Sequence, residues 1–323
     1  MVACAMLRGP RAGGRAVESV GVTWKRDLNA ALTRTTGLEL RRASDRPAAS
    51  TATSKPGRGR RRSGDRLVAR PAFVLCTLRS GSTLLRVLIN SHSQLHAPHE
   101  IHLRYISATL EKKWSARSMK EMGLDETALK YLLWDRILHR ELTSSGKPFL
   151  VTKTPNDVFI ADQIRECWPD SRFIFLLRHP AMIARSRAKL IKADDGDQEK
   201  NVELIRRYCE ALDTARNTYD GLTVRYEELT ADPATQTRRI TDFLDVRWEP
   251  GMLDYGEKDH GRFKSGLGDW ADKIKTGQVQ PAEPPPAPED VPEPLRDVAA
   301  RWGYLDAAPA PAGTPARAGD AGA

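Results

Sequence analysis

Short apolar runs recur along the middle of the chain, and each is followed by a stretch in which apolar residues repeat with helical spacing. Uninterrupted runs of this length are typical of strands that are buried on both faces. The runs cover residues 72–77, 149–152, 173–177 and 222–226. Strands that alternate with helices predict an α/β fold, a parallel sheet flanked by helices, in which ligands gather at the carboxyl ends of the strands.

Residues 101–145 interrupt this alternation. They contain two or three helical stretches, which predict a helical cap inserted into the α/β domain. Four aromatic residues mark the insertion: Tyr105, Trp114, Tyr131 and Trp134. They either line a pocket for an aromatic ligand or belong to the core, since aromatic residues at helical spacing are most often core residues.

The ends of the chain differ from its middle in composition. Residues 1–70 hold 16 Lys and Arg against 5 Asp and Glu, whereas the whole chain has a formal net charge of +9. This composition predicts a disordered basic arm, which leaves 71–280 for the α/β domain. A Pro-rich linker is expected at 281–294, a short amphipathic helix at 295–305 and a disordered tail at 306–323.

The distribution of charge and cysteine narrows the partners and the location. Because the positive charge lies in the arm, we expect no specific nucleic-acid partner, only nonspecific contact of the arm with polyanions. No run approaches the roughly 18 apolar residues of a membrane span, and the first apolar stretch is too short for a secretory signal. The four cysteines lie far apart without a CxxC pair: Cys4, Cys76, Cys167 and Cys209. We therefore predict a soluble, cytoplasmic protein with buried, reduced thiols, and the sequence predicts no oligomeric state.

The turn after the first apolar run, RSGST at 79–83, is small and polar. A helix that starts at Ser82 or Thr83 would direct free N–H groups and its dipole at one spot, and Gly81 would let the backbone approach a bound anion. Arg79 would add a bidentate donor for a phosphate or sulfate. The alternative is an ordinary strand-to-helix turn in which Ser82 or Thr83 is the N-cap.

Two motifs, the turn at 79–83 and a second segment, together make the chain resemble a known family. RSGSTLL at 79–85 resembles the 5′-phosphosulfate-binding loop of sulfotransferases that use 3′-phosphoadenosine 5′-phosphosulfate (PAPS), particularly the tyrosylprotein and bacterial branches. FLLRHPAMIARS at 175–186 resembles their 3′-phosphate motif. The resemblance spans roughly residues 70–275 and implies a P-loop-like sheet that binds PAPS as co-substrate without a metal.

Further segments match the family and complete the implied cofactor site. VTKTP carries Lys153 where the family has a strand-end lysine facing the sulfuryl group, and RYEEL carries Tyr226 where a cofactor-contacting tyrosine is expected. KSGLGDW resembles the C-terminal signature, although it lacks the adjacent Arg-Lys pair of the cytosolic branch, and Leu78 replaces the usual Pro before the loop. The implied cofactor-binding residues are Arg79, Ser80, Gly81, Ser82, Thr83, Leu84, Arg178, Ser186, Tyr226 and Lys264.

The resemblance also implies catalytic roles. Glu100 is the expected general base, with His99 or His102 as rivals, since a histidine is the base in the cytosolic branch. Arg79 and Lys153 would stabilise the charge that grows on the leaving phosphate oxygen. The four histidines between residues 92 and 102 match no common zinc spacing, so we expect no metal site.

Together these features predict transfer of a sulfuryl group from PAPS to a hydroxyl or amine of an unidentified small-molecule or peptidyl acceptor. One alternative is a nucleotide-dependent phosphotransferase, but the Gly-Lys-[Ser/Thr] sequence of P-loop kinases and NTPases is absent from the loop. The other is a noncatalytic protein that binds anions or nucleic acid through its basic arm.

Overall fold

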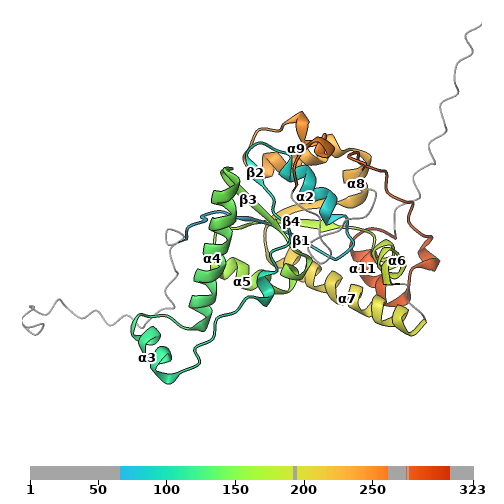
Figure 1. Cartoon of the computed structure of the whole chain (residues 1–323). Helices are drawn as coiled ribbons and strands as arrows, with labels where there is room; N and C mark the ends of the chain where they lie inside the picture. The colour runs from blue at the N-terminus through green and yellow to red at the C-terminus, as the bar shows by residue number, and fades with distance from the viewer. Residues whose placement is uncertain (1–65, 192–194, 261–273, 275, 306–323) are drawn as a thin grey trace, which may run out of the picture. The chain divides into compact units, whose positions relative to one another are not determined.

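The computed structural model describes residues 66–191, 195–260, 274 and 276–305 (Figure 1). Its centre is a five-stranded sheet in the order β2-β3-β1-β4-β5, in which every neighbouring pair is parallel. The strands are β1 (Ala72–Cys76), β2 (Leu95–His96), β3 (Phe149–Lys153), β4 (Arg172–Leu177) and β5 (Gly221–Arg225). The predicted parallel α/β sheet is confirmed, and each apolar run forms a strand. Only β2 was missed, because a two-residue strand leaves no apolar run in the sequence.

Helices cover both faces of this sheet. They are α2 (Ser82–Asn90), α3 (Lys113–Glu121), α4 (Glu126–Ser145), α5 (Ala161–Cys167), α6 (Pro180–Ile191), α7 (Asp195–Thr218), α8 (Tyr226–Ala231), α9 (Pro233–Phe243) and α11 (Glu293–Arg301). Short 3₁₀ turns lie at η3 (Leu103–Tyr105), η4 (Pro155–Ile160), η5 (Pro250–Met252), η6 (Tyr255–Glu257) and η7 (Pro288–Asp290). Among these helices, none has the combination of length and apolar character that a membrane crossing requires.

Side chains of β1 alternate between two buried clusters, as the pleat of a strand requires. Phe73 and Leu75 pack with residues of α4, α5, α6, α7 and α11. Val74 and Cys76 pack on the opposite face with α2, α8 and α9. Both faces of the strand are therefore dry, which is why the sequence shows a continuous apolar run and not an alternating pattern.

The aromatic residues of the 101–145 segment divide into two groups. Tyr131 and Trp134 of α4 are buried at 3% and 1% exposure, and the Trp134 ring stacks on Trp168 with centroids 6.4 Å apart. Tyr105 and Trp114 are 66% and 80% exposed. The hypothesis of an aromatic pocket is wrong for Tyr131 and Trp134, which are core residues because α4 packs against the sheet.

The C-terminal helix α11 packs on the same face of the sheet as α6 and α7 (Figure 1). Its apolar side, Leu295 and Val298, is buried, as is Trp302 directly after it. Asp213 of α7 accepts hydrogen bonds of 3.0 Å from Nε1 of Trp302 and from Nε of Arg301. The segment that follows the Pro-rich stretch is therefore part of the core.

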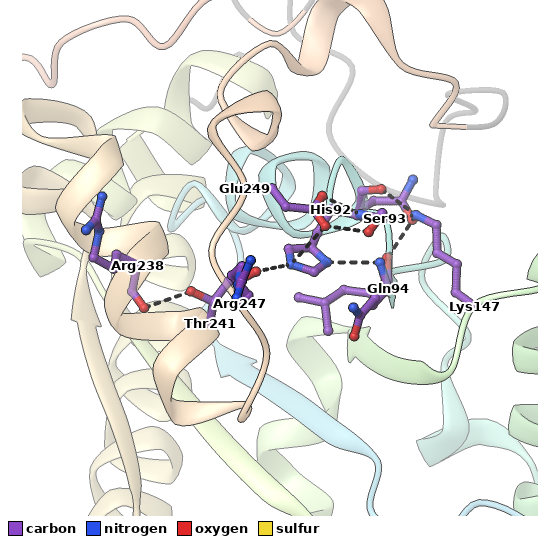
Figure 2. A network of polar contacts seen from close by, with 10 residues as sticks. His92, Ser93, Gln94, Lys147, Arg238, Thr241, Arg247 and Glu249 are labelled. Atoms are coloured by element: carbon purple, nitrogen blue, oxygen red, sulfur yellow. Dashed lines mark hydrogen bonds and ion pairs between the residues drawn. The ribbon is translucent and has the colours of Figure 1, made fainter.

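The carboxyl end of α2 is held by a half-buried lysine, Lys147 (Figure 2). Nζ of Lys147 donates to the carbonyl oxygens of Asn90, His92 and Leu95, at 2.8, 2.9 and 3.0 Å. Carbonyl groups at the end of a helix have no partner within the helix, and a cation there also interacts favourably with the helix dipole. Lys147 thus fixes the helix whose other end forms the candidate site.

Candidate functional site

The loop between β1 and α2 presents the open end of a helix. Gly81 is the N-cap and adopts a left-handed conformation with φ +84°, and no side chain caps the helix. Ser80 instead donates its hydroxyl back to the carbonyl oxygen of Thr77 at 2.8 Å. The alternative in which Ser82 or Thr83 is the N-cap is wrong, because the helix already begins at Ser82. The first N–H groups of a helix have no partner within the helix, which makes such a start suitable for an anion.

Glycine is required at position 81 for two reasons, its left-handed backbone angle and the close approach of the Tyr226 ring. A Cβ atom at this position would lie 2.2 Å from Cδ2 of Tyr226. Tyr226 is the first residue of α8, directly after β5. The absence of a side chain at Gly81 therefore lets the Tyr226 ring lie against the loop.

The two motifs that are far apart in the sequence meet at one edge of the sheet. Nη1 of Arg178 donates to the carbonyl oxygen of Arg79 at 2.8 Å, and Nε of Arg79 donates to Oγ of Ser186 at 3.2 Å. The Arg178 guanidinium carbon also lies 4.4 Å from the centre of the Tyr226 ring, a cation–π distance. They meet because β1, β4 and β5 are parallel neighbours, so that the segments following them emerge at the same edge.

Glu100 and Lys153 form an ion pair beside this cluster. Nζ of Lys153, at the end of β3, donates to Oε1 of Glu100, and Nε2 of His102 lies 3.6 Å from Oε2 of the same carboxylate. The Lys153 side chain is 1% exposed and does not line the cavity, whereas the Glu100 side chain is 12% exposed and does. The lysine that is predicted to face a sulfuryl group thus forms an ion pair with the predicted base. His99 is exposed, and neither it nor His102 lines the cavity.

The backbone around Glu100 is fixed by polar contacts on both sides. Before it, the amide of Ala97 donates to Oδ1 of Asn90 at 2.9 Å and the carbonyl of Ala97 accepts from Nη1 of Arg86 at 3.1 Å. After it, Oγ1 of Thr154 accepts from the next amide at 3.2 Å. Burial lowers the pKa of Arg86 to about 10, with the charge of Glu100 acting against that shift. Two residues of α2 and one beyond β3 therefore determine where the carboxylate lies.

Asp157 is a buried carboxyl group near this pair that the sequence analysis missed. It is 1% exposed, and its Oδ1 has no hydrogen-bond partner among the described residues. Burial raises the pKa of Asp157 to about 8, the charge of Glu100 adds to the shift and that of Lys153 opposes it. No local pattern separates a buried aspartate from an exposed one in the sequence, so only the fold identifies it.

These residues surround a cavity of about 890 Å³, a size that accommodates a nucleotide. Of the predicted residues, those that line it are Arg79, Gly81, Ser82, Thr83, Leu84, Glu100, Arg178, Ser186 and Tyr226. Ser80 and Lys153 lie behind this surface, and Lys264 lies outside the described residues. The lining also contains polar residues that were not predicted: Asn156, Arg185, Lys189 and Tyr208. Four lining residues are cationic, Arg79, Arg178, Arg185 and Lys189, and two are acidic, Glu100 and Glu283, of which Glu283 lies 3.7 Å from Lys189. The excess of positive charge suits a polyanionic ligand.

The histidines between residues 92 and 102 contact different residues and do not gather at one site. Nδ1 of His92 accepts from the amide of Gln94 at 2.9 Å, and Nε2 donates to the carbonyl oxygen of Arg247 at 2.8 Å, so both ring nitrogens are used (Figure 2). Nε2 of His96 lies 3.8 Å from Glu141 instead. Across the described ranges, no three His, Cys, Asp or Glu side chains are grouped to hold a metal ion.

Known proteins resemble this chain in sequence and in structure. The model of the sulfotransferase family matches residues 71–250. Protein-tyrosine sulfotransferase A of Caenorhabditis elegans is 23% identical over 196 residues, which cover 55% of this chain and 50% of the relative. The chain thus spans about half the length of that relative.

Two solved structures share the fold. The sulfotransferase domain of the Synechococcus PCC 7002 olefin synthase superimposes with a TM-score of 0.54 and 21% identity, over 73% of this chain and 96% of that domain. The sulfotransferase domain of the curacin biosynthetic pathway gives a TM-score of 0.50 and 22% identity, over 73% and 98%.

Proposed function

Since the chain belongs to the sulfotransferase family, we propose that this sulfotransferase takes its sulfuryl group from PAPS and transfers it to a hydroxyl or amine of an acceptor. The observation that carries the proposal is the junction of the two phosphate motifs. The RSGST loop and the Arg178–Ser186 segment, each read separately in the sequence, line one cavity and bond to each other through Arg79. One ligand that carries two phosphate groups explains why both motifs are there.

The donor groups fit the two ends of PAPS. The start of α2 and Arg79 would hold the 5′-phosphosulfate, because the first residues of the helix and the Arg79 guanidinium line the same cavity. Arg178 and Ser186 would hold the 3′-phosphate, and the Tyr226 ring would lie beside both subsites.

In the reaction, the acceptor oxygen or nitrogen forms a bond to sulfur while the bond from sulfur to the 5′-phosphate oxygen breaks. Glu100 takes the acceptor proton, and the leaving adenosine 3′,5′-bisphosphate takes the bonding electron pair. Arg79 and the N–H groups of α2 are fixed before the reaction, so they stabilise the charge that grows on the leaving oxygen. Lys153 remains the proposed second cation for that oxygen, and its pairing with Glu100 adds the task of orienting the base.

Placement favours Glu100 over the histidines as the base. Glu100 lines the cavity, whereas His99 and His102 do not. The 3.6 Å separation between Nε2 of His102 and the Glu100 carboxylate makes this histidine a neighbour of the base. We therefore keep His102 as the rival to be tested.

The proposal extends to the class of acceptor and to the cellular compartment. The relative from Caenorhabditis elegans is named for a protein-tyrosine acceptor, so peptidyl and small phenols are the first acceptors to test. The described cysteines, Cys76, Cys167 and Cys209, are free and buried, which supports a reducing and hence cytoplasmic setting.

The experiment that tests the proposal is calorimetric titration with adenosine 3′,5′-bisphosphate in the absence of added metal. We expect a micromolar or tighter dissociation constant, about −8 kcal/mol or better, because each phosphate meets an arginine. The matched ligand is 5′-AMP, which lacks the 3′-phosphate. If 5′-AMP bound as well as the bisphosphate, the assignment of Arg178 and Ser186 would be wrong. Labelled PAPS then serves to screen phenols, peptides, sugars and lipid alcohols as acceptors.

A further inference from the structure

The residues after α11 form a turn that places the Tyr304 ring beside His179, with the ring centroids 5.1 Å apart. Gly303 has φ +70°, its amide donates to the carbonyl oxygen of Ala300, and the amide of Tyr304 donates to that of Ala299, both at 2.8 Å. These two bonds and a left-handed glycine are the Schellman ending of a helix. This segment lies beyond residues 71–250, where the family model matches.

The turn is fixed to the body of the protein on both sides. Trp302, 1% exposed, donates from Nε1 to Asp213 of α7 at 3.0 Å. The carbonyl oxygen of Trp302 accepts from Nη2 of Arg225, and the guanidinium carbon of Arg225 lies 4.6 Å from the centre of the Tyr304 ring. The position of Tyr304 is therefore determined by α7 and by the end of β5.

The hydroxyl of Tyr304 donates to the carboxylate of Glu227, which follows the cavity residue Tyr226 in the sequence. It lies 2.8 Å from Oε2 of Glu227, and the other oxygen, Oε1, accepts from the backbone amide of His179 at 3.0 Å. Burial and the charge of Glu227 both raise the pKa of Tyr304, so the hydroxyl keeps its proton and remains a donor. The chain Tyr304–Glu227–His179 thus joins the C-terminal segment to the start of α6.

Glu227 and His179, which are joined by a hydrogen bond, are each next in sequence to a residue that lines the cavity. His179 follows Arg178, and Glu227 follows Tyr226. The guanidinium of Arg178 lies over the Tyr226 ring at 4.4 Å. A shift of Glu227 would therefore move the two partners of this stack relative to each other.

We propose that Tyr304 is a positioning residue for the cofactor subsite, which acts through Glu227 to hold Arg178 against Tyr226. The proposal rests on the proposed function for its ligand, the bisphosphate. It gives the C-terminal segment a task in binding the 3′-phosphate, although this segment contributes no residue to the cavity lining.

The test compares Tyr304→Phe with Tyr219→Phe in the full chain. Both remove one hydroxyl that donates to a carboxylate, since the Tyr219 hydroxyl donates to Asp162 at 2.5 Å, and neither Tyr219 nor Asp162 lines the cavity or adjoins a lining residue in the sequence. We expect Tyr304→Phe to weaken binding of adenosine 3′,5′-bisphosphate about tenfold and to leave 5′-AMP binding nearly unchanged, while Tyr219→Phe changes neither. Without ligand, hydrogen exchange at the His179 amide should be about tenfold faster in Tyr304→Phe only.

A second variant is needed because Tyr304→Phe could change affinity by loosening α11. Glu227→Ala removes the carboxylate that accepts from both Tyr304 and the His179 amide, so the losses in bisphosphate affinity of the two variants should be clearly less than additive in the double variant. Additive losses would overturn the proposal, and so would bisphosphate affinity and His179 exchange that match those of Tyr219→Phe. Faster exchange without a loss of affinity would overturn it too. If the wild type failed to bind bisphosphate, the proposed function would fail, and the exchange measurement would still decide whether Tyr304 positions the loop.

Discussion

Replacing Gly81 with alanine tests the geometry of the anion loop most directly. The substitution imposes two separate costs. A side chain at φ +84° is disfavoured by about 1–2 kcal/mol, the usual cost of a left-handed conformation for a residue with a Cβ. The new Cβ would also lie 2.2 Å from Cδ2 of Tyr226, whereas carbon atoms in contact lie about 3.5–4.0 Å apart. The Tyr226 ring must therefore move by more than about 1 Å, at an overpacking cost of about 1–3 kcal/mol.

Two other glycines separate these costs. Gly123 and Gly146 have φ +72° and +69°, and a Cβ at either position would meet nothing within 4 Å. Their alanine variants should lose only the backbone cost, about 1–2 kcal/mol, whereas Gly81→Ala should lose about 2–5 kcal/mol. Urea unfolding followed by circular dichroism gives these differences through the midpoint at a constant slope.

The binding measurement links the same substitution to function. Displacing Tyr226 removes it from Arg178 and from the loop, so Gly81→Ala should bind adenosine 3′,5′-bisphosphate at least about tenfold more weakly. Gly123→Ala and Gly146→Ala should bind it as the wild type does. A Gly81→Ala variant that is no less stable than these controls and keeps full affinity would refute the close approach of Tyr226 and the anion role of the loop.

Three further predictions concern the roles of individual side chains. Arg178→Ala should raise the KM for PAPS more than it lowers kcat, because its contact is the same in ground and transition states, whereas Lys153→Ala should do the reverse; equal kcat losses with unchanged KM would contradict this division. Glu100→Gln should keep bisphosphate affinity and lose about 10² to 10⁴ in kcat, with a larger deficit for acceptors of higher pKa, and a His102→Ala variant that alone abolishes turnover would transfer the role of base to that histidine. Asp157→Asn should flatten the pH dependence of stability. Burial raises the pKa of Asp157 from 3.8 to about 8, so between these pH values the folded protein keeps a proton that the unfolded chain releases. The stability of the wild type therefore falls as the pH rises from about 4 to about 8. Urea unfolding at about pH 5 and about pH 8 checks this, and an equal fall in both proteins would show that Asp157 is not the group responsible.

The sequence by itself determined the features that depend on neighbouring residues. Apolar runs bounded by polar turns identified β1, β3, β4 and β5, because a strand buried on both faces needs no partner to be recognised. Only β2, two residues long, was missed. The RSGST turn also predicted a helix start that suits an anion, since its small residues and its position between a strand and a helix are local properties.

The tertiary structure decided which residues far apart in the chain face one another. Arg79 meets Arg178 and Ser186 because β1 and β4 are parallel neighbours, which periodicity does not encode. The ion pair of Lys153 with Glu100 and the burial of Asp157 likewise depend on how η4 and the segment after β2 pack at the end of the sheet. Burial and pairing are properties of the assembled core, where removal of water changes the energy of every charge, so the sequence names the charged residues and the fold determines the roles that they can take.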